Sequence, residues 1–187
     1  MEKTIITPPL TDEVVAALHS GDTVYITGVI YTARDAAHKR LCDLLAAGEP
    51  LPVELRGQII YYAGPAPTKP GHAIGSVGPT TSYRMDAYAP TLMAEAGLRG
   101  MIGKGKRNEA VREAIKQYRG VYFGATGGAA ALLAGCVKSA EVILYPELGP
   151  EAVRRLEVVE FPVTVINDMY GRDLYAEAVT RWNTEIS

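Results

Sequence analysis

The sequence predicts a single α/β domain, and three observations lead to that prediction. The chain has 187 residues, a length that usually forms one domain with a core large enough to fold alone. Apolar residues make up 48% of the chain and charged residues 21%, which is the composition of an ordinary globular protein. Short runs rich in β-branched and aromatic residues alternate with segments of helical periodicity, as is typical of α/β folds.

The elements follow one another with no internal repeat and no linker long enough to divide the chain. The expected strands cover residues 4–7, 23–31, 58–63, 73–77, 100–103, 121–125, 137–145 and 158–166. The expected helices cover residues 11–18, 32–47, 83–96, 108–118 and 127–135, with a helical turn at 150–155. Thr11 and Asn108 are expected N-caps, and Gly28 interrupts its strand at a bulge or a close backbone approach. Because several strands cluster early, a mixed sheet is expected rather than a pure Rossmann sheet.

The charge balance excludes bulk electrostatic attraction to nucleic acids or anionic membranes. Lys and Arg total 19 against 21 Asp and Glu, a formal net charge of -2. No apolar stretch approaches the roughly 18 residues of a membrane helix, and residues 1–10 lack the basic region and apolar core of a signal peptide. We therefore expect a cytoplasmic protein in which any anion site is local.

The two cysteines, Cys42 and Cys136, lie far apart, and neither belongs to a CxxC pair. They are too few for a disulfide scaffold, a structural zinc site or an iron–sulfur cluster held by this chain alone. We expect no metal site in this chain, so any metal chemistry must come from another chain.

A first candidate anion site is the segment GPTTSYR, residues 78–84, between an expected strand and an expected helix. Free backbone N–H groups and the helix dipole favour a carboxylate or a phosphate there. The alternative is that Thr80 or Thr81 caps the helix and Arg84 is a solvated residue of its first turn. A cation in the first turn opposes the helix dipole, so the position of Arg84 favours anion binding.

Two further basic segments follow expected strands. Arg34 and His38 are four residues apart on one helix face and could share a ligand; the alternative is a solvated basic face in which His38 makes an ordinary hydrogen bond. The glycine-flanked turn GKGKR, residues 103–107, lacks the pattern of a nucleotide P-loop, although Lys104 supplies a point charge. The segment GATGG, residues 124–128, favours close helix packing over phosphate binding.

Four motifs, in a fixed order, carry a family resemblance: TARDAAHKR (32–40), GPTTSYRMD (78–86), MIGKGKR (101–107) and YFGATGGAAALLA (122–134). Together they resemble the β subunit of class I, iron–sulfur-dependent fumarate hydratase, whose close relative is the β subunit of L(+)-tartrate dehydratase. The resemblance extends from about Thr23 to Tyr175, and in single-chain members of the family the same region is the C-terminal domain.

The resemblance implies a swivelling β/β/α domain over residues 1–187 that docks onto a separate α subunit, in a hetero-oligomer or with further contacts between β chains. The family's α subunit carries a [4Fe-4S] cluster with one iron open to a small dicarboxylate. By match to the motifs, Arg34, Arg84 and Lys104 would bind the substrate carboxylates and Thr80 would be the base at C3 of malate. His38 and Thr81 would support these residues without touching the substrate.

The implied activity is the reversible hydration of fumarate to (S)-malate, with dehydration of L(+)-tartrate to oxaloacetate as the alternative. A non-catalytic anion-binding scaffold subunit is the alternative from a different class. A threonine hydroxyl is a weak base unless nearby cations favour its alkoxide, so orienting water is an alternative role for Thr80. The common family form GPTTAGRMD becomes GPTTSYRMD here, and the bulkier Tyr83 bears on substrate choice.

Overall fold

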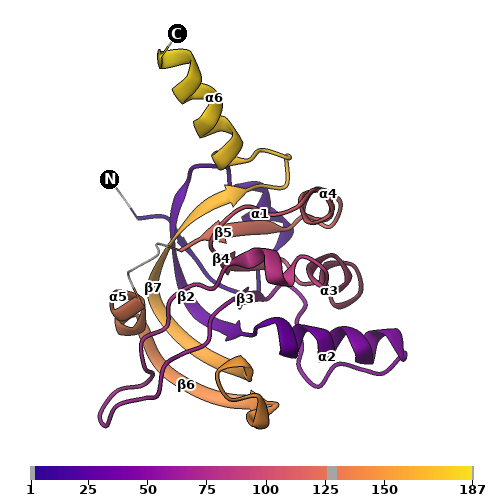
Figure 1. Cartoon of the computed structure of the whole chain (residues 1–187), viewed down its shortest axis with the longest axis vertical. Coiled ribbons are helices and arrows are strands. Elements are labelled where there is room, and N and C mark those ends of the chain that lie inside the picture. Colours follow the sequence, from indigo (N-terminus) through magenta and orange to yellow (C-terminus); the bar gives the residue numbers. More distant parts are fainter. Residues whose placement is uncertain (1–2, 126–129, 187) are drawn as a thin grey trace.

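The structure is a computed structural model that describes residues 3–125 and 130–186 (Figure 1). In that part of the chain seven strands form one mixed sheet, in the order β1-β2-β3-β4-β5-β7-β6. The strands are β1 (Ile5–Ile6), β2 (Thr23–Thr32), β3 (Ile59–Tyr61), β4 (Gly100–Gly103), β5 (Val121–Gly124), β6 (Val137–Leu144) and β7 (Val153–Asn167). The helices are α1 (Asp12–Ala16), α2 (Asp35–Ala46), α3 (Ala89–Ala96), α4 (Glu109–Gln117), α5 (Ala130–Gly135) and α6 (Leu174–Ile186), with 3₁₀ turns η1 (Ser82–Met85) and η2 (Pro146–Glu151).

The long strand β7 closes the sheet on itself. Strands β2, β3, β4 and β5 are parallel neighbours, and β7 runs antiparallel to β5. The same strand also pairs with β2, from Thr23 opposite Thr164 to Thr32 opposite Arg154. Strand β1 continues the sheet beside the start of β2, and β6 pairs with the first half of β7. The closure encloses one face of the sheet.

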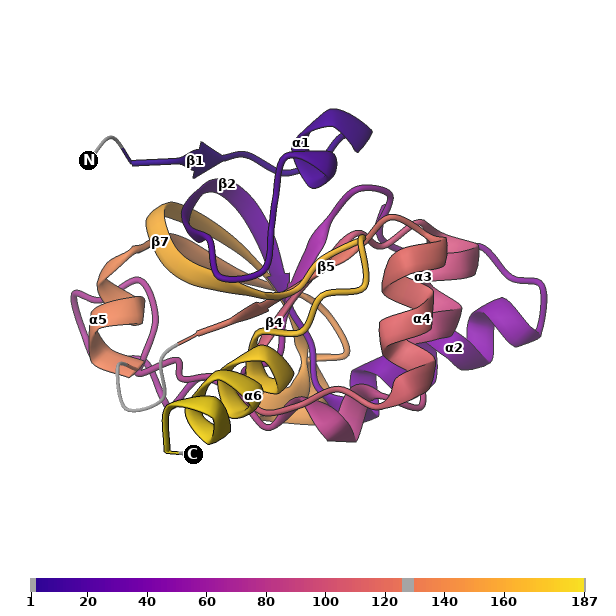
Figure 2. The same ribbon diagram turned by 90° about the horizontal axis from the view of Figure 1, so that it is seen from above.

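Side chains that alternate along the strands fill two separate cores. On β3, Ile59 and Tyr61 belong to the core enclosed by the closed sheet, whereas Ile60 belongs to the core beneath the helices. Helices α2, α3 and α4 lie together on one side of the sheet (Figure 2). Burial of each side chain of this size contributes about 1.5–3 kcal/mol of transfer free energy. Successive side chains of a strand point to opposite faces of the sheet, so this alternation determines which core each residue joins.

The α/β class, the mixed sheet and several local features are confirmed. The hydroxyl of Thr11 accepts the N–H of Val14 at 3.3 Å, and the Asn108 side chain accepts the N–H of Val111 at 2.9 Å, so both residues are N-caps. The register of β2 against β7 shifts between Ile26 and Gly28, which is the expected bulge. Gly28 has a φ of +130°, a backbone conformation that L side chains rarely adopt.

Two predictions in the middle of the chain are wrong. Residues 73–77 belong to an irregular loop, not to a strand, and the loop's prolines at 65, 67 and 70 have no N–H to donate to a strand partner. Residues 83–96 do not form one helix: η1 ends at Met85 and α3 starts at Ala89. Pro90 lies in the first turn of α3, because inside a longer helix its ring would clash with a carbonyl one turn back.

Further differences lie toward the C-terminus. The expected turn at 150–155 is wrong, because η2 ends at Glu151 and β7 already begins at Val153. Helix α5 covers the later part of the expected segment 127–135, and residues 127–129 lie outside the described residues. Helix α6, absent from the expected elements, projects from the rest of the molecule (Figure 1). Within residues 3–125 and 130–186, no helix combines the length and apolar character needed to cross a membrane.

Candidate active site

The four parallel strands bring the sequence motifs to one edge of the sheet. Because β2, β3, β4 and β5 run in the same direction, their carboxyl ends meet at that edge. Arg34 follows β2, Gly64 follows β3, Lys104 follows β4 and Ala125 follows β5. In α/β folds with parallel strands, both open sheets and closed barrels, ligands bind at the carboxyl ends of the strands. This edge is therefore the candidate active site. Residues 126–128 of the GATGG segment lie outside the described residues.

Backbone hydrogen bonds place Thr80 beside Lys104. The N–H of Thr80 donates to the carbonyl of Tyr62 at 2.6 Å, and the N–H of Lys104 donates to the carbonyl of Thr80 at 3.3 Å. The N–H of Ser82 then donates to the carbonyl of Lys104 at 2.9 Å. Thr81 and Lys104 form an isolated parallel bridge, so residues 80–82 extend the sheet past the end of β4. The proposed base and one proposed cation are thus neighbours in the structure.

A close approach at Gly103 makes this arrangement possible. A Cβ atom on Gly103 would clash with Ser82 Oγ and would lie 3.0 Å from Tyr62 Cδ2. The segment that carries Thr80 therefore packs directly on the backbone of β4. Glycine is required at this position for space, because a methyl group has no room.

Arg84 and Lys104 are exposed cations at this edge. Within the described part of the chain, neither side chain forms a hydrogen bond or an ion pair, so both guanidinium and ammonium groups are available to a ligand. The dipole argument for Arg84 is wrong, because Arg84 lies in η1 and the α3 helix begins only at Ala89. Its solvent exposure beside Thr80 is what now supports anion binding.

Arg34 is held at the edge by neighbouring groups. It occupies the N-cap position of α2, and its side chain is only 20% exposed. Arg34 Nη2 lies 3.3 Å from Glu151 Oε1. A Cβ on Gly64 would lie 3.2 Å from Arg34 Nη1, so the two residues are in contact. Since Ala63 bridges Pro79, this contact puts Arg34 near the segment that carries Thr80.

His38 does not share a ligand with Arg34 through a common exposed helix face, because it is fully buried. Its Nδ1 lies 2.8 Å from the carbonyl of Arg34, and its ring contacts Tyr62 edge to face, with 5.3 Å between ring centroids. Burial lowers the pKa of His38 to about 4, so the ring is neutral at physiological pH and Nδ1 donates to the carbonyl. The expected solvated position is therefore wrong for His38, whereas the expected ordinary hydrogen bond is confirmed.

A buried ion pair behind the edge was missed by sequence reasoning. Arg107 Nε donates to Asp86 Oδ1 at 2.6 Å, and the Arg107 side chain is completely buried. The guanidinium lies over the rings of Tyr62 and Tyr122, 5.3 and 4.9 Å from their centroids. The second Asp86 oxygen accepts the N–H of Asn108 at 2.8 Å. Asp86 and Arg107 both lie in the motifs that carry the family resemblance, but the sequence of these motifs does not indicate that the two side chains are buried.

Hydroxyl groups extend this buried network to the loop after β4. The Tyr122 hydroxyl donates to the carbonyl of Gly105 at 2.9 Å, which leaves Ser82 Oγ to donate to Tyr122 Oη at 2.8 Å. The network therefore joins the segment that carries Thr80 and Arg84 to the loop that follows Lys104. Hydrogen bonds inside the core thus fix the position of this segment relative to that loop.

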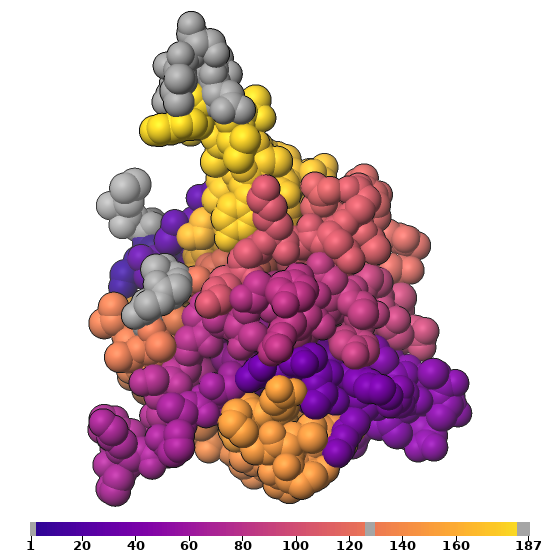
Figure 3. Space-filling view, viewed as in Figure 1, coloured from indigo at the N-terminus to yellow at the C-terminus, as the bar shows by residue number. Residues whose placement is uncertain are grey.

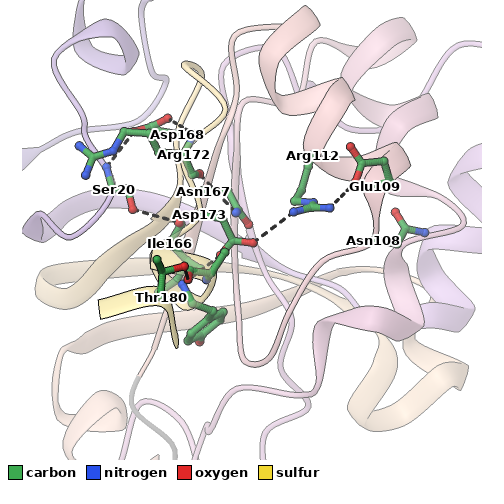
Figure 4. A network of polar contacts seen from close by, with 12 residues as sticks. Ser20, Asn108, Glu109, Arg112, Ile166, Asn167, Asp168, Arg172, Asp173 and Thr180 are labelled. Carbon is green, nitrogen blue, oxygen red and sulfur yellow. Dashed lines mark hydrogen bonds and ion pairs between the residues drawn. The ribbon is translucent and has the colours of Figure 1, made fainter. Parts of the chain in front are cut away.

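The polar residues near the C-terminus form turns and have a structural role (Figure 4). Asp168 is buried and accepts backbone N–H groups of Ser20 and Arg172 at 2.9 and 3.0 Å. Asp173 accepts the N–H of Tyr175 at 3.0 Å, which caps the start of α6, and its other oxygen lies 3.5 Å from Arg112 Nη1. These contacts join the end of β7 to the loop before β2 and to α4.

The cysteines do not fit a cluster. Cys42 Sγ lies 3.8 Å from the carbonyl of Tyr88, and burial raises the pKa of its thiol to about 11, which opposes the thiolate form that iron requires. Cys136, between α5 and β6, also has a raised thiol pKa because of burial. Among residues 3–125 and 130–186, no group of three or more His, Cys, Asp or Glu side chains could hold a metal ion.

A sizeable cavity lies elsewhere on the molecule. It has a volume of about 760 Å³ and is lined by Arg56, Arg99 and Arg119, among others. Arg99 and Arg119 both pair with the carboxylate of Asp12, at 2.6 and 2.8 Å, so their charges are already compensated. The candidate active site lies instead at the carboxyl ends of the parallel strands.

Comparison with known proteins gives consistent matches. The chain is 44% identical over 153 residues to "Fumarate hydratase class I, aerobic" of Escherichia coli K12, an alignment that covers 81% of this chain and 28% of that protein. It is 41% identical over 160 residues to "Fumarate hydratase 2" of Leishmania major, covering 85% and 28%. It is 40% identical over 173 residues to "Putative L(+)-tartrate dehydratase subunit beta" of Methanocaldococcus jannaschii, covering 90% and 89%.

The chain thus spans about 28% of the length of the two fumarate hydratases and nearly all of the tartrate dehydratase subunit. A family model described as "Fumarase C-terminus" matches residues 2–178, which include every motif at the edge of the sheet. The resemblance seen in the four motifs is therefore confirmed over almost the whole sequence, and the chain belongs to the Fumarase C-terminus family.

Proposed function

We propose that this chain is the β subunit of a hydro-lyase that interconverts fumarate and (S)-malate. The main support for this proposal is the backbone pairing that places Thr80 beside Lys104 at the carboxyl ends of the parallel strands. Arg84, two residues beyond Ser82, is exposed. The similarity to a tartrate dehydratase subunit of nearly the same extent supports a two-subunit organisation. In this proposal, the remaining part of the active site comes from a fumarase-type α subunit.

The cations would bind the two carboxylates of the substrate. Arg34 and Arg84 each present a planar guanidinium that can hold a carboxylate through two parallel hydrogen bonds, whereas Lys104 supplies a point charge. Hydration adds hydroxide to C2 of fumarate and a proton to C3, and the reverse reaction removes both. A dicarboxylate fixed at both ends presents C3 in one orientation, so proton transfer needs only one positioned group.

Thr80 would be that group. Its backbone is fixed at both the N–H and the carbonyl, so its side chain has a defined direction. The neighbouring charge of Lys104 favours a negative hydroxyl oxygen, which then accepts the C3 proton of malate; if the hydroxyl stays neutral, it orients water instead. His38 and Thr81 support the site through the backbone of Arg34 and Lys104, respectively.

The proposal assigns the [4Fe-4S] cluster to the α subunit, because Cys42 and Cys136 do not fit it. Localisation in the cytoplasm belongs to the same proposal.

Dehydration of L(+)-tartrate is the second candidate, and the extent of the match to the Methanocaldococcus protein favours it. Tyr83, next to Arg84 in the sequence, is 65% exposed, and in this second candidate it would contact the extra hydroxyl of tartrate. Steady-state assays with malate and tartrate on the assembled complex distinguish the two substrates.

Thr80→Ala tests the catalytic proposal. Because both hydrogen bonds of Thr80 use its backbone, alanine should preserve the fold, and kcat should fall by about 10²- to 10⁴-fold, the usual contribution of a positioned acid–base group. Thr91→Ala on α3 is the matched control and should keep full activity. The chain is assembled with its cluster-bearing α subunit for both assays. Unchanged turnover in Thr80→Ala would instead support a scaffold that only binds anions.

A further inference from the structure

The carboxylate of Glu151 contacts the start of α2 with both oxygens. Glu151 is the last residue of η2, far from α2 in the sequence. Its Oε2 accepts the backbone N–H of Ala36 at 3.1 Å, and its Oε1 lies 3.3 Å from Nη2 of Arg34. The two charged side chains are only 25% and 20% exposed, so the pair is largely shielded from solvent. Figure 3 shows the orange surface around η2 directly beside the violet surface of α2.

The contact compensates for an unusual helix start. The N-cap of α2 is Arg34, whereas N-caps are normally Ser, Thr, Asp or Asn, whose side-chain oxygens accept a free N–H of the first turn. Arg34 has no acceptor and makes no side-chain cap. Glu151 supplies the missing acceptor from a distant part of the chain, and the same carboxylate also binds the guanidinium.

The guanidinium is confined on its other side as well. Gly64 packs against Cδ and Nη1 of Arg34, where a Cβ would lie 3.2 Å from both atoms and 3.1 Å from the carbonyl of Pro150. Arg34 therefore lies between the end of β3 and the end of η2. A guanidinium has five N–H donors, and the ion pairs of Nη2 with Glu151 at 3.3 Å and with Asp35 at 3.9 Å leave others for a ligand. Arg34 Nε is buried without a hydrogen-bond partner within the described structure.

A second glutamate on η2 provides a contrast. Glu147 pairs with Arg40, also on α2, but these side chains are 58% and 41% exposed, and Glu147 accepts no N–H of the first helical turn among the described contacts. Exposed pairs of this kind contribute little, because water screens both charges. Both glutamates thus pair with an arginine at α2, but only Glu151 also accepts a backbone N–H of the helix and contacts a residue of the candidate active site.

We propose that Glu151 is a positioning residue that holds the Arg34 guanidinium in the orientation in which it binds a substrate carboxylate. This inference rests on the proposed function, in which Arg34 is one of the substrate-binding cations. It assigns to η2 a role in substrate binding that the sequence motifs did not suggest, because η2 lies outside all four of them.

Glu151→Gln gives a test in which positioning and simple electrostatics predict opposite results. Gln keeps an oxygen for the N–H of Ala36 but turns an amide toward Arg34, which releases the guanidinium. Loss of orientation should raise KM for (S)-malate about tenfold with kcat changed less than threefold, because a carboxylate contact acts in both the ground state and the transition state. If Glu151 acted only through its charge, its removal would lower KM for a dianionic substrate.

The measurements use the complete complex with its α subunit. Glu147→Gln is the matched control and should leave KM within twofold of the parent value. Glu151→Asp keeps the charge on a shorter side chain, so its KM should lie between those of the parent and Glu151→Gln; it also serves as the test if Glu151→Gln assembles poorly. A KM at or below the parent value in the assembled variant overturns the inference.

A double-mutant cycle with Arg34→Lys separates this inference from the proposed function. If Glu151 acts through Arg34, the double variant should be no worse than Arg34→Lys alone. A KM unchanged in Arg34→Lys contradicts both the carboxylate-binding role of Arg34 and the positioning role of Glu151. A raised KM in Arg34→Lys together with fully additive effects in the double variant contradicts only the positioning role.

Discussion

Asp86 and Arg107 form a buried ion pair, 2.6 Å between Oδ1 and Nε, directly behind the edge where the parallel strands end. Asp86 belongs to the segment that carries Thr80 and Arg84, and Arg107 follows the loop that carries Lys104. Neither charge is accessible to water in this arrangement, because the Arg107 side chain is fully buried and that of Asp86 is only 7% exposed. The pair therefore connects the two basic segments of the candidate site from inside the protein.

Removal of one partner should be costly. Asp86→Asn leaves the guanidinium of Arg107 buried without a counter-charge, so the free energy of unfolding should fall by about 3–5 kcal/mol. Urea unfolding of the chain measures this difference. Glu113→Gln breaks an exposed pair with Lys116 on α4 and should change stability by less than about 1 kcal/mol. Equal effects of the two substitutions would contradict the importance of burial.

Gly103→Ala should also weaken the site. The added methyl group would clash with Ser82 Oγ, and relief of that clash should cost about 1–3 kcal/mol and displace the segment that carries Thr80. Gly135→Ala is the control, because a Cβ there meets none of the described residues within 4 Å. Thermal melts should show a lower Tm for Gly103→Ala alone. A Tm equal to that of the parent would show that the close approach is not tight.

Arg84→Lys distinguishes geometry from charge at the exposed edge. Lysine keeps the positive charge but loses the planar fork, so kcat/KM for malate should fall roughly tenfold to a thousandfold, about 1.4–4 kcal/mol of transition-state stabilisation. The variant should melt within a few degrees of the parent, because Arg84 is exposed. Arg56→Lys, an exposed arginine that lines the large cavity, should keep full activity. Full activity in Arg84→Lys would restore the interpretation of Arg84 as a solvated residue.

His38 should make stability depend on pH. Its pKa is lowered to about 4 in the folded state from 6.5, chiefly by burial, with Arg107 opposing and Asp35 favouring the charged form. The unfolded chain therefore binds the proton first as the pH falls. The stabilisation is complete above about pH 6.5 and is lost between pH 6.5 and 4, by about 3 kcal/mol in total.

Urea unfolding at several pH values between 7.5 and 4 measures this loss. His38→Gln should remove this part of the pH dependence, whereas His72→Gln, an exposed histidine in the loop after β3, should retain it. Parallel curves for the parent and His38→Gln would contradict the neutral, buried state of His38.

Features that depend only on neighbouring residues could be predicted from the sequence. The helix starts at Thr11 and Asn108 and the bulge at Gly28 follow from side-chain acceptors and backbone freedom within a few positions. The four motifs predicted the family, and the parallel order of β2 to β5 then placed Arg34, Thr80, Arg84 and Lys104 at one edge. Local patterns failed where proline interrupts a periodic segment, as at Pro90.

Contacts between residues far apart in the chain depend on how the elements pack and could not be predicted from local patterns. Glu151 reaches Arg34 across 117 positions because η2 packs on α2, and Asp86 meets Arg107 because the segment at Thr80 lies on β4. The closure of the sheet by β7 is of the same kind, since a strand's partner depends on chain path and not on its own residues. A charge pattern shows that ions are present, but burial decides which of them pair and which remain free for a substrate.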